Sequence, residues 1–153
     1  MQPWAFDRAY EAWDIHPMPR FALLEHSGAP DDPAGLHWDL LLEAGDACRT
    51  WRLAAIPRPG GAAVPADGIA PHRLAWLDHE AGEVSGGRGF ARRVDAGEFT
   101  LSDGCLTGDG PAGPLAVRLA GTTLAGTLVI ASAGAGWSMR FASGAQEVDR
   151  RPS

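Results

Sequence analysis

The sequence predicts a small, mainly β protein, a closed or nearly closed antiparallel β-barrel with few short helices. Short apolar runs of strand length alternate with turn sequences along most of the chain. The 153 residues include 20 glycines and 12 prolines, which separate these runs instead of gathering in one tract. No segment reads as a convincing long helix, and closing the sheet removes the strand edges that would otherwise aggregate.

The first three expected strands cover residues 21–26, 37–43 and 49–56. Between the second and third lies Ala44-Gly45-Asp46, a sequence typical of a tight turn. If residues 44–47 form a hairpin turn that pairs Glu43 with Cys48, the antiparallel register places Arg52 opposite Asp39 with both side chains on one face.

Glycine-rich and proline-rich loops separate several of the later expected strands. Loops are expected at residues 57–61, 85–89 and 133–136, where glycine and proline cluster. Tryptophans recur within the expected strands, at positions 38, 51, 76 and 137, and are expected to pack in the barrel wall. The remaining expected strands cover residues 73–79, 90–94, 98–101, 115–119, 124–131 and 137–142.

The ends of the chain are expected to lie outside the barrel domain, which we place at residues 18–145. Residues 1–17 form an N-terminal extension, because Pro17-Met18-Pro19 interrupts the chain after them. Residues 146–153 form a C-terminal tail. Both Met1 and Met18 remain possible natural starts.

Composition excludes several classes of function. The formal net charge of −6 disfavours a long, avid nucleic-acid groove, so any such contact is expected to be short and weak and to rest on local arginines. The two cysteines, Cys48 and Cys105, lack the spacing of a disulfide framework or a zinc ribbon, which points to a reducing compartment. Without a membrane-spanning run or a signal peptide, the expected location is the cytoplasm.

Two histidines and an aspartate on the first two strands form a candidate metal site. His37 and Asp39 are two residues apart, so in an extended strand their side chains share a face. His26 ends the preceding strand. Two imidazoles and one carboxylate, with positions left open, suit a catalytic manganese, iron or zinc ion rather than a closed structural site.

The order of the motifs in residues 20–141 resembles one family, the 3'-phosphoesterase domain at the N-terminal end of bacterial DNA ligase D and in stand-alone homologues. Each motif is short, but the ordered set is specific. The set comprises Arg20-Phe21, Glu25-His26, Leu36-His37-Trp38-Asp39-Leu40 with Glu43, Trp51, Asp78-His79, Gly87-x-Gly89, Asp95-x-Gly97-x-Phe99, Leu119-x-Gly121, Leu124-x-Gly126 and Trp137-x-Met139-x-Phe141.

This resemblance implies a barrel that uses manganese, or zinc or another transition metal, to remove a phosphate or a ribonucleoside from 3' ends during DNA repair. The metal ligands would be His26, His37 and Asp39, and His79 would hold the scissile phosphate. The implied partners are a nucleic-acid 3' end and DNA repair ligases or polymerases.

The chain departs from the family at three places, one of which is a longer loop between the first two ligands, at residues 27–35. An arginine is usual two residues after the metal-binding aspartate, where this chain has Leu41, and the family's active-site tyrosine is missing near Glu83 and Val84. Arg52 is a candidate replacement because of its expected register. Arg88 is a second, because the surrounding glycines let backbone N–H groups approach an anion.

Two other functions stay open for the same site. A phosphoesterase acting on a small nucleotide fits the acidic balance and the shortened loop. A non-catalytic, metal-binding barrel that serves as an interaction module fits the loss of the arginine and the tyrosine. Asp31 and Asp32, in the long loop between the first two ligands, add negative charge near the site, and His72 is expected to be an exposed loop residue without a role.

Overall fold

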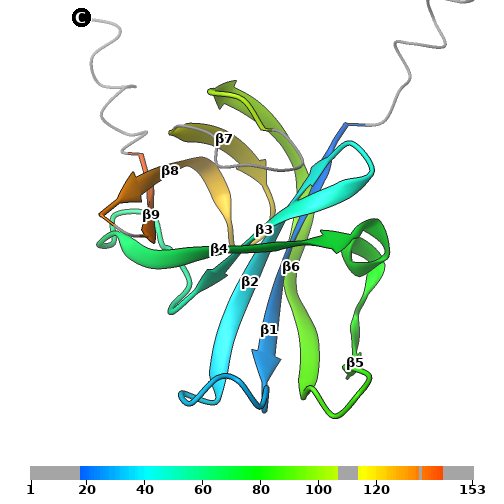
Figure 1. The fold of residues 1–153 in the computed structure, drawn as a ribbon. Coiled ribbons are helices and arrows are strands. Elements are labelled where there is room, and N and C mark those ends of the chain that lie inside the picture. Colours follow the sequence, from blue (N-terminus) through cyan, green and yellow to red (C-terminus); the bar gives the residue numbers. More distant parts are fainter. Residues whose placement is uncertain (1–17, 107–113, 135, 143–153) are drawn as a thin grey trace, which may run out of the picture.

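The computed structural model describes residues 18–106, 114–134 and 136–142, which form one antiparallel sheet (Figure 1). The expected N-terminal extension and C-terminal tail lie outside these residues. No helix within the described ranges is long and apolar enough to cross a membrane. The elements are β1 (Arg20–Ser27), β2 (Leu36–Ala44), β3 (Ala47–Leu53), β4 (Val64–Arg73), the 3₁₀-helix η1 (Leu74–Asp78), β5 (Ala81–Glu83), β6 (Phe90–Asp103), β7 (Leu115–Ala120), β8 (Ala125–Ala133) and β9 (Gly136–Phe141).

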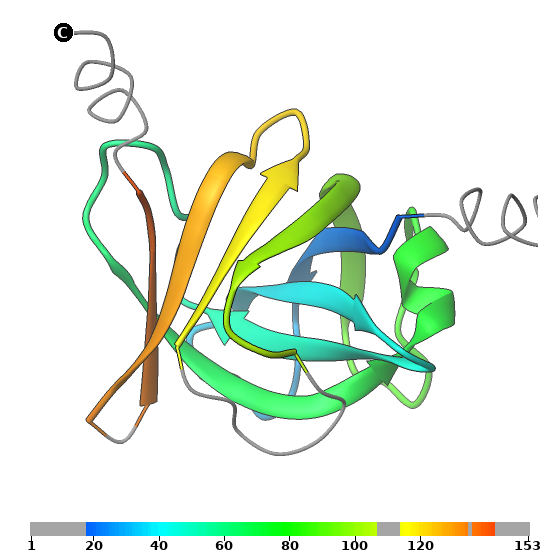
Figure 2. The ribbon, with the colours of Figure 1, turned by 90° about the horizontal axis from the view of Figure 1, so that it is seen from above.

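Eight of the strands close into a barrel, which confirms the predicted fold class. The neighbours run in the order β1-β2-β3-β4-β9-β8-β7-β6, and β6 pairs back onto β1. The view from above shows this closure (Figure 2). The short strand β5 pairs with β6 outside the barrel.

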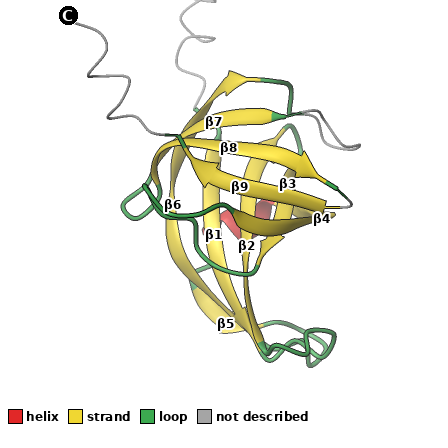
Figure 3. Ribbon diagram, turned by 90° about the vertical axis from the view of Figure 1, so that its left-hand side faces the viewer, coloured by secondary structure: helices red, strands yellow, loops and turns green. Residues whose placement is uncertain are grey.

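Alternating side chains fill the barrel and leave a second, smaller cluster on its outer surface. On β1 and β2, residues such as Phe21 and Leu40 point into the main core around Trp51. The alternate residues point outward, and η1 covers part of them, with Leu77 packed on Leu41 and its neighbours. The site described below lies on this outer face, beside η1. Figure 3 shows η1 in red, partly hidden behind the strands of the barrel.

The segment around β4 and η1 differs from the sequence prediction. A strand was expected at residues 73–79, but β4 ends at Arg73 and the next five residues form η1. The strand at residues 64–73 was missed because Pro65, Gly68 and Pro71 resemble turn sequence. Pro71 is tolerated because it lies where the pairing with β3 shifts register, between the Cys48 and Thr50 pairs.

One long strand replaces two expected short ones. Residues 90–94 and 98–101 both belong to β6, so Gly97 does not mark a turn. A Cβ atom at Gly97 would lie 2.4 Å from the carbonyl oxygen of Ala120 on β7. The glycine is therefore required by the close approach of two strands, which a sequence reading cannot distinguish from a turn.

A buried carboxylate joins β6 to the turn between β7 and β8. Oδ1 of Asp95 accepts hydrogen bonds from the backbone N–H groups of Ala96 and Thr122, and Oδ2 accepts from those of Thr123 and Leu124. Because these donors would otherwise lack an acceptor, Asp95 fixes one end of the barrel.

The tryptophan prediction is confirmed in part. Trp51 is fully buried, and Trp38 and Trp137 pack against the main core. Trp76 is different, because it lies on η1 outside the barrel and lines a cavity. Both cysteines are free thiols, Cys48 buried and Cys105 exposed.

Candidate metal centre

The three predicted metal ligands meet on the outer face of the barrel. His26 and His37 are directly opposite each other in the β1–β2 ladder, and Asp39 follows two residues later on β2. One nitrogen or oxygen atom from each residue lies within 4.8 Å of the others. His37 and Asp39 are only 3% and 4% exposed, so the ligands are held largely out of water.

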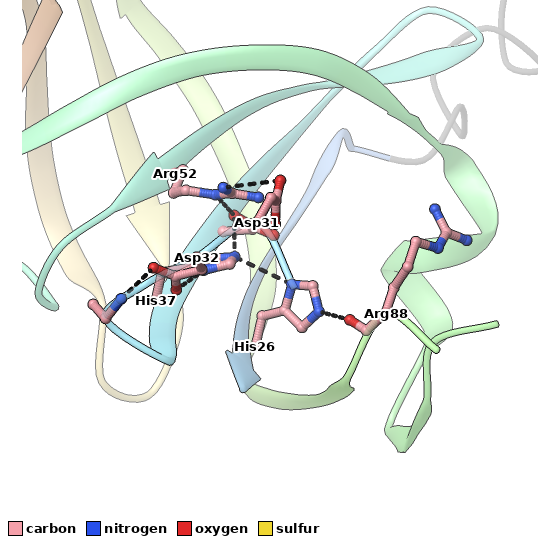
Figure 4. Close-up of polar contacts among 8 residues, drawn as sticks. His26, Asp31, Asp32, His37, Arg52 and Arg88 are labelled. Atoms are coloured by element: carbon pink, nitrogen blue, oxygen red, sulfur yellow. Dashed lines mark hydrogen bonds and ion pairs between the residues drawn. The ribbon is translucent and has the colours of Figure 1, made fainter. Parts of the chain in front are cut away.

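The hydrogen-bond partners of the two rings decide which nitrogen atoms carry protons (Figure 4). The carbonyl oxygen of Arg88 lies 2.7 Å from Nε2 of His26 and can only accept, so Nε2 donates. The carboxylate of Asp32 lies 2.7 Å from Nδ1 of His37 and fixes that proton in the same way. In the neutral rings, the lone pairs therefore reside on Nδ1 of His26 and Nε2 of His37.

These two lone-pair atoms face each other at 3.1 Å. Two neutral rings in these tautomers would repel at that distance, so the pair needs either a proton or a cation between them. Oδ1 of Asp39 lies 3.6 Å from the same nitrogen of His37 and is buried without a hydrogen-bond partner. Three atoms with lone pairs therefore converge here, and two of them belong to rings whose other nitrogen is held by a hydrogen-bond acceptor. This arrangement fits a divalent metal.

Charge around His37 supports the same arrangement. Burial lowers the pKa of His37, but its interactions with Asp39 and Asp32 outweigh burial and raise the pKa above the usual histidine value. The hydrogen bond with His37 lowers the pKa of Asp32, so its carboxylate remains an acceptor at neutral pH. Without a metal, His37 thus holds a proton more readily than an ordinary histidine, and a bound cation would take the proton's place.

The sequence analysis missed the contact that Asp32 makes with a candidate metal ligand. Asp32 was read as general negative charge, whereas the structure places its carboxylate on Nδ1 of His37. The loop geometry explains this, because the backbone N–H groups of Gly28 and Gly35 bond within the loop and bring residue 32 back over β2. A carboxylate five residues before a candidate histidine was the signal available.

An Asp32→Asn variant tests this role. The amide offers a weaker acceptor and no charge, so His37 loses its fixed orientation and part of its basicity. We expect the affinity for Mn²⁺ to fall by about 10- to 100-fold, the usual effect of losing such an outer partner. Calorimetric titration measures it, with the neighbouring Asp31→Asn as the control, because the ion-pair contact of Asp31 is with Arg52. Equal affinities for the two variants would contradict the assignment.

The predicted position of Arg52 is confirmed. The turn pairs Glu43 with Cys48, and Arg52 on β3 lies opposite Asp39 on β2. The two side chains share a face, with Nε of Arg52 3.8 Å from Oδ1 of Asp39. On its other side, Nη1 lies 3.9 Å from Oδ2 of Asp31. Nε is buried without a hydrogen bond, so the guanidinium beside the ligands retains an unused donor.

Leu41 shows why an arginine is absent from the position that the resemblance leads one to expect. Its side chain is fully buried in the outer apolar cluster, together with Leu24, Cys48 and Leu77. A guanidinium there would be desolvated beneath η1. Arg52, on the adjacent strand and 28% exposed, is the cation that reaches the ligands from this side.

Arg88 lies at the site in a different way from that expected. Its Nε donates to the carbonyl oxygen of Ser85 at 2.7 Å, and its Nη2 contacts Oγ of the same serine at 3.1 Å. The side chain runs away from the two histidine rings (Figure 4). Its guanidinium lines the cavity, but the contact with the candidate ligands comes from its backbone carbonyl, which orients His26.

The structure does not bring His79 to the ligands. Its Nε2 is 3.0 Å from the carbonyl oxygen of Ala91, and its ring packs on Trp76 at a centroid distance of 4.7 Å. It lines a separate hollow of about 240 Å³ together with Trp76. His79 does not line the cavity beside the candidate ligands, so the phosphate contact expected for it finds no support in the structure.

A cavity of about 600 Å³ opens beside the ligands. His26, Asp39 and Arg52 lie in its lining together with Trp76 and His72. The sequence analysis gave His72 no role and placed Trp76 in the barrel wall. The sequence around His72 and Trp76 does not indicate that they line a cavity, because their placement depends on the path of β4 and η1.

No protein-family model matches this chain, and no curated protein sequence matches it either.

Proposed function

We propose that this protein is a metal-dependent phosphoesterase that removes a phosphate or a ribonucleoside from the 3' end of nucleic acid, as in DNA repair, with Mn²⁺ as the preferred ion. The observation that carries the proposal is the convergence of two oriented imidazole lone pairs and a buried carboxylate beside a guanidinium, in one cavity. The motif order that resembles the 3'-phosphoesterase domain supports the same chemistry.

The protein groups divide the work between holding the ion and holding the substrate. His26, His37 and Asp39 would bind the ion, while Arg88 and Asp32 orient the two rings. A bound divalent ion supplies a Lewis acid for a phosphoryl oxygen and lowers the pKa of water. His26 and Asp39 line the cavity, whose volume of about 600 Å³ leaves room for the phosphoryl group.

Arg52 is the residue that we assign to the phosphoryl group. Its distances to Asp39 and Asp31 exceed those of hydrogen bonds, so its donors are available to an anion. A guanidinium binds phosphate oxygens through two parallel hydrogen bonds and offsets the charge that develops during transfer. It takes the part that the resemblance gives to an arginine at Leu41.

An Arg52→Gln variant should lower kcat/KM by about 100-fold, because one lost donor to a transferring phosphoryl group costs about 3 kcal/mol. Arg52 is not a metal ligand, so Mn²⁺ affinity should change little. Steady-state kinetics and a metal titration on the same preparation separate the two effects. Arg140→Gln, an exposed arginine on β9, is the control. Unchanged kinetics in Arg52→Gln would remove Arg52 from the site.

The assay that tests the proposal uses a labelled primer-template with either a 3'-phosphate or a 3'-terminal ribonucleotide, with and without Mn²⁺. We expect Mn²⁺-dependent trimming by the wild type and none by His37→Ala. A folded, Mn²⁺-loaded wild type that trims neither end would overturn the proposal. Turnover of a free nucleotide alone would instead favour the small-nucleotide phosphoesterase.

A further inference from the structure

Two aromatic side chains of the cavity have no part in the chemistry proposed above. Trp76 comes from η1 and His72 from the end of β4, and both line the cavity that holds His26, Asp39 and Arg52. Their ring centroids are 6.1 Å apart with an interplanar angle of 63°. Both side chains are partly buried, so they form a fixed wall that still reaches open space.

The indole ring of Trp76 is held from behind. It packs against the outer apolar cluster around Leu77, and the ring of His79 lies 4.7 Å from it. His79 is itself fixed by the contact of Nε2 with the carbonyl oxygen of Ala91, 3.0 Å away. An aromatic surface supported in this way loses little freedom when a ligand stacks on it.

The rest of the cavity lining combines apolar surface with cationic side chains. Leu24, Pro30, Pro71 and Val84 contribute the apolar surface, and Arg52, Arg73 and Arg88 line the same cavity as His26 and Asp39. Its volume of about 600 Å³ lies within the range of small-molecule sites. A flat aromatic group joined to a phosphoryl group matches these features, whereas inorganic phosphate would leave the apolar walls unused.

We propose that Trp76, with His72 beside it, is the specificity-determining wall on which the base of the substrate's terminal nucleoside stacks. This inference rests on the proposed function and deepens it, because it names the substrate as a nucleoside-bearing phosphoester. It also gives His79 a role as a positioning residue for Trp76. Stacking of a base on an aromatic side chain changes affinity by about 10- to 100-fold.

Calorimetry with adenosine 3'-monophosphate and with inorganic phosphate tests the wall without turnover. Each probe is titrated into the Mn²⁺-loaded and the metal-free protein. We expect the nucleotide to bind the wild type about 10- to 100-fold more tightly than phosphate. Trp76→Ala should lose this margin while its phosphate affinity stays unchanged, and Trp76→Phe should keep most of it. Leu74→Ala is the control for damage to η1, because Leu74 packs on the same apolar cluster but is not in the cavity lining.

His79→Phe provides a test of the positioning role. It keeps a ring against Trp76 but removes the contact with Ala91, so the nucleotide margin should fall only in part and phosphate affinity should not change.

The stacking role of Trp76 would be refuted if the wild type bound the two probes with equal affinity. It would also be refuted if Trp76→Ala still preferred the nucleotide to phosphate as strongly as the wild type does. The outcome is separable from that of the proposed function. A nucleotide preference without Mn²⁺-dependent trimming would refute the phosphoesterase and leave the base site standing. Mn²⁺-dependent trimming without any preference for the nucleotide would support the phosphoesterase and refute the base site.

Discussion

An Asp39→Ala variant should fold, yet gain no stability from Mn²⁺. In the wild type, an ion at 100 times its dissociation constant stabilises the fold by about 2.7 kcal/mol, which raises the Tm of a domain of this size by roughly 10 °C. Removing Asp39 takes away one of the three ligands, and its effect should exceed the 10- to 100-fold loss typical of an outer partner. Thermal melts with and without Mn²⁺ measure this difference.

The same variant should be close to neutral without metal. Oδ1 of Asp39 is buried without a hydrogen bond, and the nearest basic atoms are Nε2 of His37 at 3.6 Å and Nε of Arg52 at 3.8 Å. The wild-type carboxylate is thus poorly satisfied, which is typical of a residue kept for function rather than stability. We expect the metal-free unfolding free energy to change by less than about 1 kcal/mol. An Mn²⁺-dependent Tm shift that survives in Asp39→Ala would place the ion elsewhere.

The largest loss of stability is expected at Asp95, far from the metal centre along the chain. Replacing it with alanine leaves four backbone N–H groups without their acceptor, including the buried one of Leu124. Since unsatisfied donors and lost charged hydrogen bonds each cost about 1–3 kcal/mol, and water will reach some of these donors, we expect a loss of about 4 kcal/mol. That is a large part of the total stability of an ordinary domain.

Urea unfolding of two companion variants sharpens the test. Asp95→Asn keeps one oxygen and turns an NH₂ group toward two donors, so it should lose about half as much as the alanine variant. Asp103→Ala, on the same strand, removes an exposed carboxylate that accepts a hydrogen bond from the backbone N–H of Gly104, and should cost less than about 1 kcal/mol. Similar losses at Asp95 and Asp103 would contradict the view that Asp95 fixes this end of the barrel.

The fold class and the shared face of His37, Asp39 and Arg52 could be predicted from the sequence because they depend on short-range pattern. The i, i+2 spacing of His37 and Asp39 places them on one face, and the turn at Gly45 sets the register that brings Arg52 opposite Asp39. These relations involve neighbouring strands joined by a short turn, so the strand period alone determines them.

What could not be predicted depends on how distant segments approach one another. Pro65 and Pro71 make the sequence of β4 resemble a turn, so the strand was expected at η1 instead and Trp76 was placed in the barrel wall. The bond between Asp32 and His37 arises from the path of the loop, and the approach of β7 explains Gly97 better than any local pattern. Contacts of this kind leave no periodic mark in the sequence.

The central claim is that His26, His37 and Asp39 hold one ion beside Arg52. Crystals grown with Mn²⁺ and phosphate, measured at the manganese absorption edge, test it most directly. The account predicts one anomalous peak bonded to Nδ1 of His26, Nε2 of His37 and Oδ1 of Asp39, with phosphate oxygens on Arg52. An anomalous peak elsewhere would contradict the claim. The absence of any peak between His26 and His37, which would then share only a proton, would contradict it as well.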